Sequence, residues 1–307
     1  LPVPEGLRTP FMLLIRPGAS PLFFYSSPMI WIEEANTGDL LSAGFIFGFI
    51  LLVFLYRRCL TQWARLVAIY AVLLALQVGV PMGKTLGMIP PLAAAFFPVV
   101  PIGVIFFTLG FIPELNPRDQ DALLSRLDRA LCRVDPSVWM ERFTFPWITE
   151  VMQLAYLAYY VLPFVLLGIL YQRGDAEAFN ICITALLLSH YFAFIGYMMV
   201  PALGPRFALA SQYRKELKGP LLAEPVRNLV NVLEGIKRDA FPSGHTSAIL
   251  ITVFYAFQFT PGMSSLFVAI AGLMILSTLY LRYHYVVDIL AGILLAALCL
   301  LLAPLLQ

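Results

Sequence analysis

The sequence predicts an all-α protein, a polytopic bundle of six to eight membrane-spanning helices. Hydrophobic residues make up 60% of its 307 residues and charged residues only 12%, against roughly 45–50% and about 25% in soluble domains. The mean hydropathy of +0.84 agrees with this composition. The chain also contains eight long apolar stretches, and a helix needs about 20 residues to cross a bilayer. Little of the chain is left for a soluble domain.

The eight stretches lie at 40–56, 66–80, 90–112, 147–171, 177–200, 243–259, 264–283 and 284–305. The first two are short for a full crossing. The third contains four prolines, so we expect it to be kinked or broken, because proline removes a backbone donor. Between the third and fourth stretches, residues 119–133 alternate charges with leucines at a spacing of three and four, namely Leu123, Leu124, Leu127 and Leu131. This pattern is typical of an amphipathic helix on the membrane surface.

These patterns divide the chain into four regions. Residues 1–39 contain six prolines and are predicted to form an irregular N-terminal arm near the interface. Residues 40–112 form N-terminal membrane helices, and 113–146 form an interfacial amphipathic segment. Residues 147–307 form a transmembrane core that carries the candidate catalytic residues.

The charge distribution predicts which connections share a side. If all eight stretches cross, the connections 57–65, 113–146 and 201–240 lie on the same side as the 282–284 junction. That side carries 16 Lys or Arg, and the other side carries four. The positive-inside rule then favours a cytoplasmic location for the richer side.

Composition excludes several partners. The net charge is +2, which indicates no nucleic-acid partner. The four cysteines are far apart and form no metal-binding or redox spacing. We therefore expect no metal and no other cofactor, and nothing in the sequence assigns an oligomeric state.

Two short motifs hold two of the three histidines. The first is Phe-Pro-Ser-Gly-His-Thr-Ser at 241–247, directly before an apolar run. Ser243 suits a helix cap, Gly244 allows close backbone approach, and free N–H groups at a helix start bind phosphate. The second motif opens the last stretch, with His284 and Asp288 four residues apart and hence one turn apart on a helix face. A carboxylate there can accept the imidazole Nδ1–H and leave Nε2 free as a nucleophile.

The spacing of the motifs predicts that they meet. His245 and His284 are 39 residues apart, about two membrane crossings joined by a short turn. A helix out and a helix back would return the second histidine to the face where the first lies. The loop that holds Arg206 leaves the fifth stretch on that same face. Ionisable side chains at the edge of a membrane destabilise the protein unless they form ion pairs or take part in its function.

The pairing of Pro-Ser-Gly-His with a distant His-x-x-x-Asp resembles the type-2 phosphatidic acid phosphatase superfamily of lipid phosphatases, lipid phosphotransferases and vanadium haloperoxidases. The resemblance covers roughly residues 147–305. It implies that His284 attacks phosphorus, that Asp288 orients it and that His245 protonates the leaving oxygen. It also implies that Arg206, Ser243, Gly244 and Arg282 hold the phosphoryl oxygens without a metal.

Some details differ from the family's pattern. The first motif is usually Lys-x6-Arg-Pro, but Met199 stands seven residues before Arg206, and Pro205 precedes that arginine. The third motif usually begins with Ser-Arg six residues before the histidine, where this chain has Thr278. The 39-residue gap and the Tyr-His-Tyr-x-x-Asp string resemble the inositol phosphorylceramide synthase and sphingomyelin synthase branch, which implies headgroup transfer.

The expected function is phosphoryl transfer on a membrane lipid phosphate or phosphodiester through a phosphohistidine. The acceptor is water, or an alcohol such as inositol or another lipid. Two alternatives stay open: a haem-binding membrane electron carrier, and a non-catalytic transporter or scaffold of the same fold. The location of the site also stays open, since the charge count favours the cytoplasm and the resemblance implies an extracytoplasmic or lumenal face.

Three further features of the core have simpler interpretations. His190 lies in the middle of the fifth stretch, and we expect a hydrogen-bonded packing role. Tyr156, Tyr159 and Tyr160 pack as aromatic residues or line a lipid entry cleft. Lys237 and Arg238 precede the first motif. We interpret them as part of a solvated loop, and attraction of an anionic headgroup is the alternative.

Overall fold

A computed structural model describes residues 35–233 and 235–307. Within these residues every regular element is a helix, and seven helical segments are long and apolar enough to cross a membrane. The prediction of a polytopic all-α bundle is confirmed. Most of the predicted N-terminal arm lies outside the described residues.

The first two spans are longer than the sequence predicts. They are α2 (Thr37–Leu55) and α3 (Trp63–Thr85). Helix α2 begins within the predicted arm because Asn36 caps it, with its side chain accepting the Asp39 N–H at 2.9 Å. Helix α3 continues past Pro81 to a polar end at Thr85, which a search for apolar runs misses.

The proline-rich third span is broken, as predicted. Residues 91–115 form α4 (Pro91–Phe96), α5 (Val100–Thr108) and α6 (Ile112–Leu115), joined by single 3₁₀ turns. Prolines stand in the first turn of all three of these helices, where a missing N–H costs nothing.

The remaining spans form the core. In chain order they are α9 (Pro146–Tyr156) with α10 (Ala158–Gln172), α11 (Ala176–Met199), α14 (Gly244–Phe259), α15 (Ser264–Tyr280) and α16 (Val286–Leu302). Helix α11 is the most buried of the seven candidate spans. Helix α14 contacts α10, α11, α15 and α16, so its first residues lie at the centre of one end of the bundle. At 16 residues, α14 is shorter than the seven candidate spans.

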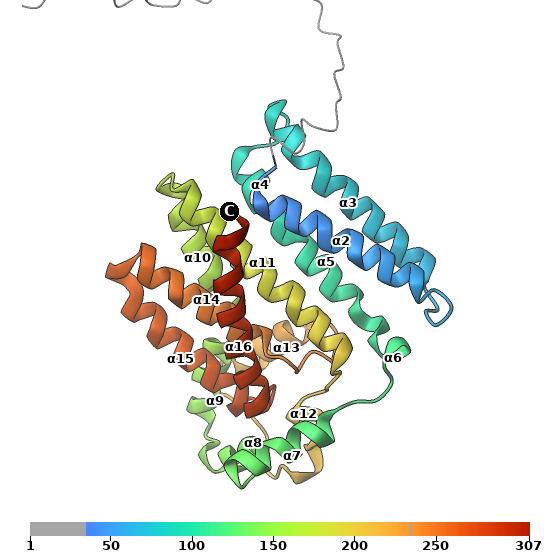
Figure 1. Ribbon diagram of the computed structural model, residues 1–307. Helices are drawn as coiled ribbons and strands as arrows, with labels where there is room; N and C mark the ends of the chain where they lie inside the picture. The colour runs from blue at the N-terminus through green and yellow to red at the C-terminus, as the bar shows by residue number, and fades with distance from the viewer. Residues whose placement is uncertain (1–34, 234) are drawn as a thin grey trace, which may run out of the picture.

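The two longest connections gather at one end of the bundle, as the parity of the crossings predicts for them. Short helices α7 (Asp121–Cys132), α8 (Pro136–Trp139), α12 (Pro205–Ala208) and α13 (Ala223–Leu233) lie there (Figure 1). The Gln120 N–H donates to the Pro201 carbonyl at 2.7 Å, which ties these two connections together. At the opposite end, the Thr37 hydroxyl donates to the Leu306 carbonyl.

Helix α7 is amphipathic, but its two faces differ from the expected ones. Leu123, Leu127 and Leu131 are exposed on one side, consistent with an apolar face toward lipid. Leu124 is buried against the protein and does not belong to this stripe. It lies on a second face, where buried aspartates contact the candidate site.

Candidate active site

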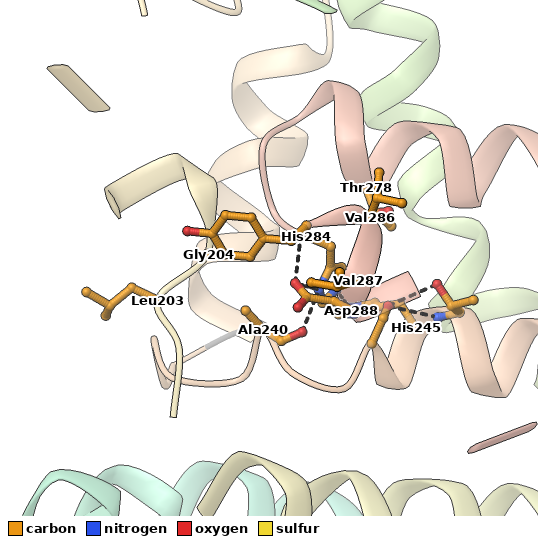
Figure 2. Close-up of polar contacts among 12 residues, drawn as sticks. Leu203, Gly204, Ala240, His245, Thr278, His284, Val286, Val287 and Asp288 are labelled. Atoms are coloured by element: carbon orange, nitrogen blue, oxygen red, sulfur yellow. Dashed lines mark hydrogen bonds and ion pairs between the residues drawn. The ribbon is translucent and has the colours of Figure 1, made fainter. Parts of the chain in front are cut away.

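The two motif histidines touch each other. His245 is the second residue of α14, and His284 lies in the turn between α15 and α16. Nδ1 of His245 is 3.1 Å from Nε2 of His284, and both rings are buried. Figure 2 labels both residues, together with Ala240 and Asp288. The hairpin of α14 and α15 therefore brings together two residues 39 positions apart, as their spacing predicts.

His284 is held by a backbone carbonyl as well as by Asp288. Its Nδ1 lies 2.8 Å from the Ala240 carbonyl and 3.5 Å from Asp288 Oδ2. His284 stands before α16 and not in its first turn, because Tyr285 is the extended N-cap residue. Asp288 completes a capping box by accepting the Tyr285 N–H at 2.7 Å. The carbonyl fixes the proton on Nδ1, which leaves Nε2 of the neutral ring as an acceptor facing His245.

The pKa of His284 follows from the same contacts. Burial lowers it, because a charged imidazole loses hydration. The hydrogen bond and charge of Asp288, the charge of Asp239 and the Ala240 carbonyl together outweigh burial. The net effect raises the pKa above its ordinary value of 6.5.

Ser243 and Gly244 set the geometry where α14 begins. The Ser243 side chain caps the helix by accepting the Thr246 N–H at 3.2 Å, and the Ser243 N–H donates to the Asp288 carbonyl at 3.0 Å. A Cβ on Gly244 would meet the Tyr197 hydroxyl at 2.7 Å. Neither residue is among those that line the cavity beside the histidines. Their predicted contact with phosphate stays a prediction.

A polar cavity of about 330 Å³ opens beside the histidine pair. Arg206, Lys237 and Asp239 line it together with both histidines. Arg206 also donates to Asn231 Oδ1 at 2.8 Å, which orients its guanidinium. The cavity thus combines two cations and two imidazoles with one carboxylate, and the cations suit it to a phosphate group.

Arg282 does not line the polar cavity. Its guanidinium stacks over the Tyr213 ring at 3.7 Å and donates to the Lys215 carbonyl at 2.8 Å. It also pairs with Glu141 at 3.4 Å. Arg282 has a left-handed backbone (φ 69°) and is absent from the residues that line the polar cavity. Of the two predicted arginines, only Arg206 is brought to the histidines.

A second, largely apolar cavity of about 480 Å³ adjoins the first and shares His245 and Asp239 with it. Its walls come from the broken third span, α10 and α11. Tyr159 and Tyr160 line it, in keeping with the lipid cleft considered above. His190 also lines it, with Nδ1 2.7 Å from the Leu186 carbonyl and Nε2 3.0 Å from the Tyr159 hydroxyl.

Three aspartates hold the segments that carry the site. Asp121 accepts the N–H groups of Leu203 and Gly204, each at 2.9 Å, just before Arg206. Asp128 accepts the N–H groups of Val286 and Val287 at 2.9 Å, just after His284. Asp119 pairs with Arg238 at 2.6 Å, ahead of the first motif. The connection that contains α7 therefore fixes the relative positions of all three motif-bearing segments.

Four residues around the histidines are not predicted to belong to the catalytic site. The sequence predicts packing or a lipid cleft for Tyr156 and a solvated loop for Lys237, and it predicts no role for Tyr283 or Asp239. Tyr156 lies 2.8 Å from Nε2 of His245, Tyr283 stacks on Tyr156, and Lys237 and Asp239 line the polar cavity. The only feature of the sequence that points to Lys237 and Asp239 is their position a few residues before the first motif. Lys237 and Arg238 appeared equivalent in the loop, yet only Lys237 faces the cavity.

The contact between the histidines bears on the alternative of haem ligation. Two axial ligands of a haem lie on opposite sides of the porphyrin, whereas these rings are hydrogen-bonded to each other. Among the described residues, no group of three or more His, Cys, Asp or Glu side chains has the arrangement of a metal site.

Comparisons with known proteins agree with the resemblance. The model of the PAP2 superfamily matches residues 122–302, more than half of the chain. A PA-phosphatase related-family protein of Dictyostelium discoideum is 25% identical over 173 residues, which make up 50% of this chain and 31% of that protein. The chain thus matches less than a third of this relative's length. No solved structure matches. The chain belongs to the PAP2 superfamily.

Proposed function

We propose that the protein transfers a phosphoryl group from a membrane lipid phosphate or phosphodiester by way of a phosphohistidine on His284. The observation that carries this proposal is the 3.1 Å contact between His245 and His284, at the wall of a cavity that also holds Arg206 and Lys237. A candidate nucleophile, a candidate acid and two cations therefore line one cavity.

The two cavities support a lipid as substrate. The phosphate occupies the polar cavity, and the hydrocarbon extends into the apolar cavity between the third span and α10. Because the two cavities meet at His245, the bond between phosphate and lipid alcohol lies beside that ring.

In the first step, the lone pair of His284 Nε2 forms the N–P bond while the bond from phosphorus to the lipid oxygen breaks. The departing oxygen takes the Nδ1 proton of protonated His245, which leaves a neutral ring with its proton on Nε2. Arg206 and Lys237 balance the negative charge on the remaining phosphoryl oxygens. In the second step, His245 takes a proton from water or an alcohol, whose oxygen attacks phosphorus and breaks the N–P bond.

Product analysis distinguishes hydrolysis from transfer. The purified protein is incubated with radiolabelled phosphatidic acid or phosphatidylinositol, with and without inositol or ceramide, and the products are separated by thin-layer chromatography. Free phosphate from phosphatidic acid indicates a phosphatase. A new phosphodiester indicates a transferase, as expected for the inositol phosphorylceramide synthase and sphingomyelin synthase branch. A protein that converts none of these lipids contradicts the proposal.

Two variants separate the roles of the histidines. We expect His284→Ala to lower turnover by about 10³-fold or more and to abolish an acid-labile phosphoprotein. Normal turnover or labelling in that variant contradicts the assignment. His245→Ala should slow alkyl phosphate esters by about 10²–10⁴-fold, the usual contribution of general acid catalysis. It should spare p-nitrophenyl phosphate, whose leaving group needs no proton, and an equal loss on both substrates argues against an acid role.

A further inference from the structure

Tyr156 contacts the side of His245 that faces away from His284. It ends α9, is fully buried and places its hydroxyl oxygen 2.8 Å from His245 Nε2. Its ring stacks on Tyr283 with centroids 4.7 Å apart. The hydroxyl is therefore held by a packed ring and not by a flexible side chain.

The Ala240 carbonyl determines which atoms donate in the hydrogen bonds that link His284, His245 and Tyr156. The Ala240 carbonyl can only accept, so Nδ1 of His284 carries a proton and Nε2 of the neutral ring accepts. The donor to that nitrogen is His245 Nδ1–H. In a neutral His245, Nε2 then has no proton, and the Tyr156 hydroxyl donates to it. The chain of contacts runs from Tyr156 through His245 to His284.

The same contact serves both charge states of His245. When the ring is protonated, Nε2–H donates to the phenol oxygen instead, because a hydroxyl both donates and accepts. The ring therefore keeps one orientation while its charge changes. In each state Nδ1 faces Nε2 of His284, 3.1 Å away.

We propose that Tyr156 is a positioning residue, which holds His245 with its Nδ1 directed toward His284 and hence toward the phosphate that His284 attacks. This inference rests on the proposed function, because it assigns the acid role to His245. It adds a residue from α9 that lies outside both histidine motifs. Since Tyr156 acts through His245, it should matter only for substrates that need the acid.

Tyr159 supplies a matched control. Its ring also packs against His245, with centroids 4.2 Å apart, but its hydroxyl bonds to His190. Tyr156→Phe and Tyr159→Phe each remove one hydroxyl and keep an aromatic ring beside His245. The first removes the hydrogen bond to His245 Nε2, and the second removes the hydrogen bond to His190.

The experiment measures kcat of the detergent-solubilised full chain on short-chain phosphatidic acid and on p-nitrophenyl phosphate. We expect Tyr156→Phe to lower kcat about 10-fold or more on the lipid and less than about 3-fold on the aryl ester. Tyr159 lines the apolar cavity, so Tyr159→Phe can raise KM for the lipid, but it should not lower kcat selectively. In a His245→Ala background, Tyr156→Phe should cause no further selective loss, because the group it positions is gone.

The possible results separate the two proposals. An active wild type in which Tyr156→Phe changes nothing, or slows both substrates equally, overturns the positioning role alone. A selective loss that persists without His245 also overturns it. A wild type that cleaves neither ester, with His284→Ala indistinguishable from it, overturns the proposed function and the positioning role together.

Discussion

The carboxylate of Asp128 lies 2.9 Å from the backbone nitrogen of Val286, so a residue of α7 caps a transmembrane helix 158 positions away in the chain. The N–H groups at a helix start have no partner within the helix. Asp128 satisfies two of them, directly after His284. The position of the candidate nucleophile therefore depends on a short helix outside the transmembrane core.

Asp128→Ala should destabilise the protein by about 1–2 kcal/mol, the usual cost of losing a helix cap. Its turnover should fall at temperatures where the protein stays folded, because the turn that holds His284 loosens. Thermal unfolding and initial rates at 20 °C check both effects. Arg126→Ala, on the exposed face of the same helix, is the control. Equal stability and turnover in the two variants would show that the cap is dispensable.

Substitution of Arg206 and substitution of Arg282 should have different kinetic effects. Arg206 lines the polar cavity, so Arg206→Ala should raise KM or lower kcat for a lipid phosphate, with kcat/KM down by about 10²-fold. Arg282 is buried against Tyr213 and Glu141, so Arg282→Ala should mainly lower the melting temperature. Steady-state kinetics and thermal unfolding of both variants test this assignment. A selective rise in KM for Arg282→Ala would place that side chain in phosphate binding after all.

The pH dependence of turnover should reflect the raised pKa of His284. Its nucleophilic form is neutral, so activity should rise with pH through a value above 6.5. Asp288→Asn removes the carboxylate that favours the imidazolium. The acid limb should therefore move to lower pH, even as kcat falls through poorer orientation. Profiles of kcat/KM against pH check the direction, and an acid limb that moves upward contradicts it.

The same pKa makes a prediction about stability. The folded-state pKa of His284 is above its unfolded value, so protonation of this residue stabilises the folded chain. That contribution is fully present below about pH 6.5 and is lost as the pH rises through the folded pKa. The melting temperature of His284→Ala relative to wild type should show it. A difference that grows with rising pH would contradict the direction of the shift.

Gly204 should not tolerate a side chain. Its φ is +81°, and a Cβ would collide with the Tyr283 carbonyl beside the polar cavity. Gly204→Ala should cost at least about 1–2 kcal/mol from backbone strain alone and should displace Arg206. Gly168→Ala in α10 is the control, because a Cβ there meets no atom within 4 Å. Similar melting temperatures and rates for the two variants would contradict this account.

The sequence predicted the parts of the site that depend on local pattern and on crossing length. The hairpin from His245 to His284 needs only two spans of similar length, and their contact follows from that. The position of Arg206 followed from the parity of the crossings. The breaks in the third span followed from its prolines.

Contacts that depend on side-chain packing were not predictable. Arg206 and Arg282 both lie in polar turns near the motifs, and only the left-handed backbone at Arg282 and its stacking on Tyr213 separate them. Similarly, Asp121 and Asp128 appeared to be surface charges of an amphipathic helix. Their partners are backbone N–H groups of distant segments, which leave no periodic signal in the sequence.

The length of α14 bears on how deep the reaction centre lies. Sixteen residues span about 24 Å at 1.5 Å per residue, some 6 Å less than the hydrocarbon thickness of about 30 Å. With its far end level with the opposite bilayer surface, its first turn would be recessed below the headgroup plane. A substrate would then have to sink its charged group toward the acyl chains, and water would reach the reaction centre only through the protein. Such a recess would favour lipids already resident in the leaflet over soluble esters arriving from the aqueous phase.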